Sequence, residues 1–171
     1  QRATVNQAET IANMPTIRDD LHRVGRANVM LETVDQVSPE REPNAALYRM
    51  LVGALTALDK QDAPLVLAGF LLKLLSLEGF HPQLDVCVAC GKDSNLVAFD
   101  VDDGGLRCRD DRRGIAIDHE AIFLMRQMLG GELSAALRDP ASPATAEAEA
   151  FAVVLGEPPI ERRFRDARSR L

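Results

Sequence analysis

Apolar residues recur at helical spacing along most of this chain, which predicts a structure built mainly from α-helices. A first helix is predicted to begin at Thr16, which can cap the free N–H groups of the first turn, with Asp19 at the capping-box position. The residues expected on its inward face are Ile17, Leu21, Val24, Leu31 and Val34. A second helix is predicted from about Asn44 to Leu58, with an apolar stripe made by Leu47, Leu51, Ala54, Leu55 and Leu58.

A third predicted helix, from about Ala63 to Leu77, is apolar on nearly every side and is therefore expected at the centre of the core. Gly79 favours a left-handed end to this helix, and Pro82 prevents its continuation.

The second half of the chain predicts three more helices. Asp118 is expected to cap a helix that runs to about Leu129 and ends at two glycines, and residues 144–155 are compatible with another. A last helix follows Pro159, with an apolar stripe made by Ile160, Phe164, Ala167 and Leu171.

Between Pro82 and Ile117 the helical period disappears, which predicts a different local structure. The segments 95–99 and 106–108 are expected to pair as a short β-hairpin. The turn between them is acidic, with Asp100, Asp102 and Asp103, but the ligand spacing of an EF-hand does not follow, so a solvated turn is predicted. The predicted fold class is thus mainly α, a helical bundle with an inserted zinc-ribbon-like β-hairpin and knuckle.

Three cysteines within this insertion have the spacing of metal ligands. Cys87 and Cys90 form a C-x2-C pair, Cys108 follows after 17 residues, and a second x2 step ends at Asp111. A zinc module has C-x2-C, a spacer of about 15–20 residues and a second C-x2-C, so three of the four positions are filled by cysteine. We predict a structural zinc site formed by Cys87, Cys90, Cys108 and Asp111.

Several alternatives for this cluster remain open. Asp110 or His119 could supply the fourth ligand instead of Asp111, or the site could be degenerate, with buried free cysteines and no metal. A disulfide is disfavoured by the odd number of cysteines and by the absence of a signal peptide, which favours the cytosol, where thiols stay reduced. A catalytic metal is disfavoured because the chain has no H-E-x-x-H motif.

Composition and charge limit the classes of function. The 171 residues are 46% hydrophobic without tryptophan, which predicts one domain with an aliphatic core, and no apolar stretch is long enough to span a membrane. The net charge is −6, yet residues 160–171 carry +3, so the other 159 carry −9. This distribution predicts local phosphate contact by the terminal arginines, or else a solvated face, at Arg162, Arg163, Arg165, Arg168 and Arg170.

The leucine-rich run from Phe70 to Gly79, followed by Phe80-His81-Pro82 and the cysteine cluster, resembles the C-terminal helical domain of the bacterial DNA repair protein RecO. Residues 7–21 resemble the passage from that family's N-terminal barrel into its first helix, and residues 42–58 resemble its second helix. The resemblance implies that residues 1–14 are a linker or the end of a missing barrel. Residues 15–171 would then be the helical domain, with the cysteine cluster at 83–117.

The resemblance also implies a function, that of a recombination mediator in DNA repair. The family binds DNA, anneals strands coated by single-strand binding protein and, with RecR, helps to load RecA. The expected partners are therefore RecR, the acidic C-terminal tail of single-strand binding protein, and DNA, the last bound weakly without the barrel, in a cytoplasmic, nucleoid-associated protein. Asp111 stands where the family has its fourth cysteine, so the resemblance implies the fold more firmly than the metal.

Two other classes of function compete with this one. The acidic body favours a zinc-knuckle helical adaptor with only protein partners. A redox switch is conceivable because three thiolates with a weak fourth ligand could lose metal on oxidation, but no basic neighbours of the thiolates are evident in the sequence. We expect no enzyme, since no nucleophile–base pair or phosphate-binding glycine loop is visible.

Overall fold

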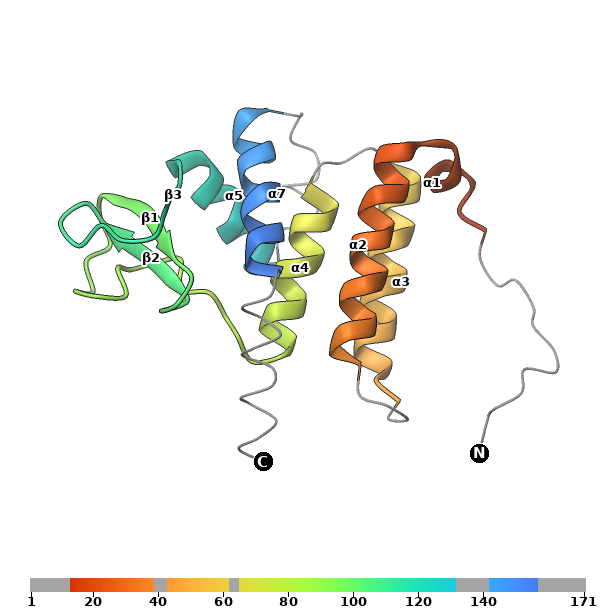
Figure 1. The fold of residues 1–171 in the computed structure, drawn as a ribbon, viewed down its shortest axis with the longest axis horizontal. Coiled ribbons are helices and arrows are strands. Elements are labelled where there is room, and N and C mark those ends of the chain that lie inside the picture. The colour runs from red at the N-terminus through yellow and green to blue at the C-terminus, as the bar shows by residue number, and fades with distance from the viewer. Residues whose placement is uncertain (1–12, 39–42, 62–64, 132–141, 157–171) are drawn as a thin grey trace.

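The computed structural model describes residues 13–38, 43–61, 65–131 and 142–156. Its helices are α1 (Pro15–Asp19), α2 (Leu21–Val37), α3 (Ala45–Lys60), α4 (Leu65–Leu77), α5 (His119–Leu129) and α7 (Pro143–Gly156). A small antiparallel sheet has the strand order β2-β1-β3, formed by β1 (Leu96–Asp100), β2 (Gly105–Cys108) and β3 (Ile115–Ala116). In Figure 1 the sheet lies at the opposite end of the molecule from α2 and α3, with α4, α5 and α7 between them. The predicted fold class is confirmed.

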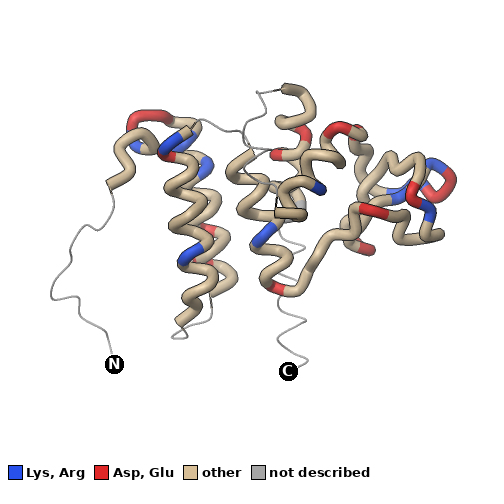
Figure 2. The backbone as a smooth tube through the Cα atoms, turned by 180° about the vertical axis from the view of Figure 1, so that it is seen from behind, with Lys and Arg blue, Asp and Glu red and all other residues tan. Residues whose placement is uncertain are grey.

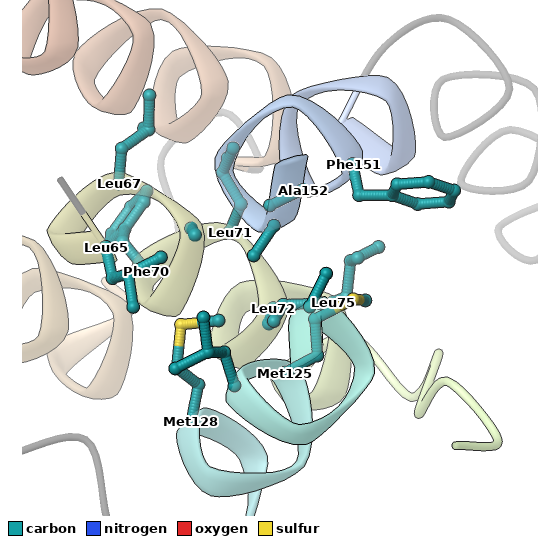
Figure 3. Packing of buried hydrophobic residues seen from close by; sticks show 14 of the residues in the cluster. Leu65, Leu67, Phe70, Leu71, Leu72, Leu75, Met125, Met128, Phe151 and Ala152 are labelled. Carbon is teal, nitrogen blue, oxygen red and sulfur yellow. The ribbon is translucent and has the colours of Figure 1, made fainter. Parts of the chain in front are cut away.

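Helix α4 forms the centre of the core, as its all-round apolar pattern predicts. It contacts α2, α3, α5 and α7, and ten of its thirteen residues are buried. Figure 3 shows Leu71, Leu72 and Leu75 of α4 beside Met125 of α5 and Ala152 of α7. Because each buried leucine loses most of its contact with water, this aliphatic packing supplies the main stabilisation of the fold.

The end of α4 has the predicted left-handed glycine. Gly79 has φ +86°, and the N–H groups of Gly79 and Phe80 donate to the carbonyls of Ser76 and Leu75 at 3.1 and 2.8 Å. This pair of bonds is a Schellman motif, which satisfies carbonyls that the helix end would otherwise leave free. The chain then turns away toward the cysteine segment.

The prediction of one helix starting at Thr16 is wrong. Asp20 has extended φ and ψ angles, and its carboxylate accepts hydrogen bonds from the N–H groups of His22 and Arg23, so it ends α1 and caps α2. Of the residues predicted to face inward, Ile17 is buried, and Val24 and Val34 are partly buried against the core. Leu21 and Leu31, predicted to face inward, are 84% and 47% exposed, and the buried residues of α2 are instead Ala27, Met30 and Val37.

The other predicted elements of the described part are confirmed within a few residues. Asn44 caps α3 and Asp118 caps α5, each through its side-chain oxygen. Strand β3 was not predicted, because two residues carry no periodicity. Phe99 of β1 packs edge to face against Phe151 of α7, with ring centres 5.9 Å apart, and so joins the sheet to the bundle. No helix within the described ranges is both long and apolar enough to cross a membrane. The predicted helix after Pro159 lies outside the described residues.

Candidate functional site

The cysteine-bearing insertion, residues 83–117, is called here the cysteine finger. Its first segment lies beside β2 through backbone hydrogen bonds: Leu106 donates to the carbonyl of Gln83 at 2.9 Å, and Val88 donates to that of Leu106 at 2.9 Å. Gly105 permits this close approach, because a Cβ there would lie 2.4 Å from Cγ1 of Val88. The pairing brings the first two cysteines next to the strand that carries the third.

The C-x2-C pair lies on a tight knuckle. The N–H of Gly91 donates to the carbonyl of Cys87 at 2.8 Å, and the N–H of Cys87 donates to the carbonyl of Lys92 at 2.7 Å. Gly91 has φ +76°, a left-handed conformation that residues with a Cβ rarely adopt. The knuckle is also tied to the bundle, since Nε of Arg126 in α5 donates to the carbonyl of Leu84 at 2.8 Å.

The structure brings the four predicted ligands together. One ligand atom from each of Cys87, Cys90, Cys108 and Asp111 lies within 4.8 Å of every other. The Sγ atoms of Cys90 and Cys108 are 3.7 Å apart, and Sγ of Cys108 is 3.5 Å from Oδ2 of Asp111. A disulfide would need about 2.05 Å, so the thiols are free.

Two of these separations fit a tetrahedral zinc ion. With Zn–S of about 2.3 Å and Zn–O of about 2.1 Å, tetrahedral geometry places two sulfurs about 3.8 Å apart, and a sulfur and an oxygen about 3.6 Å apart. The two measured distances lie within about 0.1 Å of these values. Cys87 and Cys108 are buried while Cys90 and Asp111 are exposed, so such a site would have one side open to solvent.

The electrostatics of the group also favour a cation. Burial raises the pKa of Cys87, but backbone N–H groups from the knuckle and from Cys108 outweigh it and lower this pKa to about 7. At Cys90 the N–H of Lys92 lowers the pKa, yet the Asp111 carboxylate, burial and the other thiols raise it to about 12. Hydrogen bonds from the thiols of Cys90 and Cys108 lower the pKa of Asp111. The thiols and the Asp111 carboxylate lie so close together that they retain a proton, which a bound divalent ion would displace.

The alternative fourth ligands are not part of the group that the described residues form. The carboxylate of Asp110 points to Lys92, with Nζ to Oδ2 at 2.8 Å. His119 is the first residue of α5 and is exposed. Among the three candidates, Asp111 is thus the residue whose carboxylate lies beside the thiols.

Two basic residues that were not predicted as neighbours of this group lie near the thiols. Lys92 lies close enough that hydrogen bonding and charge from Asp110, together with charge from Cys90 and Cys108, raise its pKa. Arg107, whose side chain crosses from β2 to the acidic turn, also interacts with Cys87. Figure 2 shows acidic and basic residues interleaved along this end of the molecule. The signal was present in the sequence, since Lys92 lies two residues after Cys90 and Arg107 directly precedes Cys108.

The acidic turn is only partly solvated, contrary to the prediction. Asp102 and Asp103 have side chains that are 81% and 50% exposed, but the side chain of Asp100 is 3% exposed. Its carboxylate accepts hydrogen bonds from Arg107 at 3.0 and 3.2 Å, and Arg113 lies 3.4 Å away. Asp100 therefore stabilises the β1–β2 turn from inside the finger.

A second feature is a groove of about 250 Å³ between α3 and α4, called here the α3–α4 groove. Apolar and small side chains form most of it, with one basic residue from each helix: its lining is Arg49, Met50, Gly53, Ala54, Ala57, Val66, Phe70 and Lys73. None of these residues was predicted to bind a partner. Arg49, Gly53 and Ala57 recur at four-residue spacing and therefore lie on one face of α3, where the small side chains of Gly53 and Ala57 leave room for a groove. This spacing was the available signal in the sequence.

The five arginines predicted to contact DNA, Arg162, Arg163, Arg165, Arg168 and Arg170, lie outside the described residues. Their role, and the assignment of residues 1–14 to a linker, stay predictions.

Comparison with known proteins identifies the family. The family model described as "Recombination protein O C terminal" matches residues 18–155, which include the bundle and the whole cysteine finger. DNA repair protein RecO of Bifidobacterium adolescentis is 34% identical over 175 residues, covering 96% of this chain and 71% of that protein. RecO of Frankia casuarinae is 37% identical over 140 residues (78% and 58%), and RecO of Bacillus pumilus is 36% identical over 108 residues (63% and 42%).

The chain thus matches between 42% and 71% of the length of these three relatives. The resemblance stated from the leucine-rich helix and the cysteine cluster is confirmed. This chain belongs to the family of recombination protein O C-terminal regions.

Proposed function

We propose that this chain is the C-terminal part of a DNA repair protein that acts as a recombination mediator, working with RecR and single-strand binding protein in strand annealing and RecA loading. The observation that carries the proposal is the family match over residues 18–155. Relatives that share this region are named DNA repair protein RecO. Pull-down of RecR and single-strand binding protein by this chain separates the proposal from a helical adaptor with other protein partners, which would capture neither.

The cysteine finger is proposed to hold one structural zinc ion. Its ligands would be Cys87, Cys90, Cys108 and Asp111. The bonds from zinc to these ligands would join the knuckle to β2. Metal analysis of the purified chain is expected to give one zinc per chain, lost in Cys87→Ser and in Cys108→Ser. Well under one zinc in the unmodified chain would refute the assignment.

The α3–α4 groove is the proposed site for the tail of single-strand binding protein. That tail is acidic and has an apolar end, and the groove offers the matching chemistry. The half-buried Met50, Ala54 and Ala57 give an apolar surface, while Arg49 and Lys73 supply positive charge. A carboxylate beside either cation would gain a charge-assisted hydrogen bond.

The test is a titration of the chain with a fluorescent peptide that copies this tail. Gly53→Leu should abolish binding without unfolding the chain, because no atom lies within 4 Å of a Cβ at Gly53, so the added side chain occupies the groove. Lys73→Glu should weaken binding by about tenfold or more. Lys60→Glu is the matched control, since Lys60 is an exposed lysine at the end of α3, outside the groove lining. Unchanged affinity in Gly53→Leu would exclude this groove as the site.

The terminal arginines are proposed to make the DNA contacts of this part of the protein. Binding should be weak and should fall steeply with salt, because phosphate contacts release counterions. Replacing Arg162, Arg163 and Arg165 together by alanine should reduce DNA affinity and flatten the salt dependence in a fluorescence anisotropy titration. Equal affinity of this variant and the unmodified chain would contradict the assignment.

A further inference from the structure

The three thiols of the cysteine finger are not equivalent, and their differences determine which pair can react. Cys90 is exposed on the knuckle, whereas Cys87 and Cys108 are each 1% exposed. A small oxidant that approaches from solvent therefore reaches Cys90 first. The raised pKa of this thiol slows the attack but does not change which sulfur is accessible. Asp111, the fourth member of the group, is exposed as well.

Cys108 lies within reach of an oxidised Cys90. The Sγ atoms of the two residues are 3.7 Å apart, so forming a disulfide requires the two sulfurs to approach by about 1.7 Å. Gly91, directly after Cys90, has the left-handed conformation that turns the knuckle. It has no side chain, so nothing at this position obstructs movement of the loop. Cys87 is held differently, since its buried sulfur accepts hydrogen bonds from several backbone N–H groups of the knuckle and of Cys108.

We propose that Cys90 and Cys108 are a peroxide-sensitive thiol pair, in which a disulfide replaces the metal as the link between the knuckle and β2. The sulfur of Cys90 attacks one oxygen of hydrogen peroxide, the O–O bond breaks, and a sulfenic acid and one water form. The sulfur of Cys108 then attacks the sulfenic sulfur and displaces hydroxide, which leaves as a second water after taking up the thiol proton. Two electrons pass from the sulfur pair to the peroxide, which ends as water.

This oxidation removes two of the four ligands. Cys87 and Asp111 alone cannot complete a tetrahedral site, so a bound zinc ion leaves. The release of metal rests on the proposed zinc site, whereas formation of the disulfide does not. The backbone bonds between residues 83–88 and β2 involve none of the sulfurs, so the oxidised finger stays folded and a dithiol reductant restores it.

The experiment treats the zinc-loaded chain with hydrogen peroxide and follows thiols, released zinc and peptide linkage. Free thiols are expected to fall from three to one, with one zinc released per disulfide, and dithiothreitol should reverse both changes. Trypsin cleaves after Lys73, Lys92, Arg107 and Arg109, so Cys87 and Cys90 share one peptide and Cys108 lies on another. The expected map joins these two peptides, and fragmentation after alkylation locates the remaining free thiol at Cys87.

Serine variants give matched controls. Cys87→Ser should still form the link to Cys108, and Cys90→Ser should lose it. A disulfide within the Cys87–Cys90 peptide, or a link to Cys108 that forms at an unchanged rate in Cys90→Ser, would overturn the proposal. Because the peptide map of the unmodified chain suffices, the test does not depend on the folding of a variant.

The outcomes also separate this proposal from the zinc site. A chain that contains no zinc but forms the Cys90–Cys108 link supports the thiol pair and refutes the metal assignment. A chain that binds zinc and retains it, with three thiols, under excess peroxide refutes the thiol pair and leaves the metal assignment standing.

Discussion

The buried carboxylate of Asp100 is expected to be a major source of stability in the cysteine finger, and Asp100→Asn tests this. The side chain is 3% exposed and its charge is matched by Arg107, which is 12% exposed, and by Arg113. It also accepts the N–H of Asp102 at 3.1 Å, which closes the turn. Asparagine keeps the shape but leaves the partly buried guanidinium of Arg107 without this negative charge beside it.

Removing one partner of a buried ion pair costs about 3–5 kcal/mol. The lower end, about 3 kcal/mol, is expected here because Arg107 also contacts Asp103 and because asparagine retains one acceptor. Asp102→Asn is the control, since that side chain is 81% exposed and should cost less than about 1 kcal/mol. The assay is urea unfolding followed by circular dichroism, with the chain reduced and metal-free so that metal loss does not contribute.

The pH dependence gives an independent check. Burial raises the pKa of Asp100, but the N–H of Asp103 and the charges of Arg107 and Arg113 outweigh it and hold this pKa below 3.8. A carboxyl whose pKa is lower in the folded state contributes stability above its unfolded pKa and loses it as pH falls through the folded value. The difference between the unmodified chain and Asp100→Asn should therefore be constant at neutral pH and shrink below about pH 3.8. A neutral-pH loss as small as that of Asp102→Asn would refute this account.

Three further predictions concern the core, the turn after β2 and the metal. Leu72→Ala should lower the free energy of unfolding by about 3 kcal/mol in the same assay, because Leu72 is 0% exposed. Leu77→Ala is the control and should cost much less, since Leu77 is 46% exposed. Equal losses in the two variants would contradict the packing described for α4. Gly114→Ala should destabilise by more than about 2 kcal/mol, since φ is +93° and a Cβ would lie 2.1 Å from the carbonyl oxygen of Phe99. Gly53→Ala, where a Cβ meets nothing within 4 Å, is its control and should be neutral or stabilising. Asp111→Ala should weaken zinc binding about tenfold or more in a competition titration and Asp111→Cys should strengthen it, while Asp110→Ala, a change outside the group, should leave it unchanged.

Local patterns in the sequence determined most of the elements. Asn44 and Asp118 determine where α3 and α5 begin, and Gly79 determines where α4 ends. They were predictable because caps and left-handed glycines act through hydrogen bonds within a few residues. The all-round apolar run of α4 predicts its central position for a similar reason, since no orientation of that helix leaves a polar face for water. The C-x2-C knuckle is equally local, and so it too was predictable.

Tertiary structure determined which of several residues with equally suitable spacing form the candidate site. Spacing left Asp110, Asp111 and His119 as alternatives. The pairing of residues 83–88 with β2 brought the three thiols together, and the carboxylate of Asp111 lies beside them while that of Asp110 pairs with Lys92. The burial of Asp100 and the α3–α4 groove likewise depend on residues distant in sequence. Periodicity assigns a face to each element but does not state what lies against that face, and contact between distant segments fixes the exposure, the charge partners and hence the chemistry of each side chain.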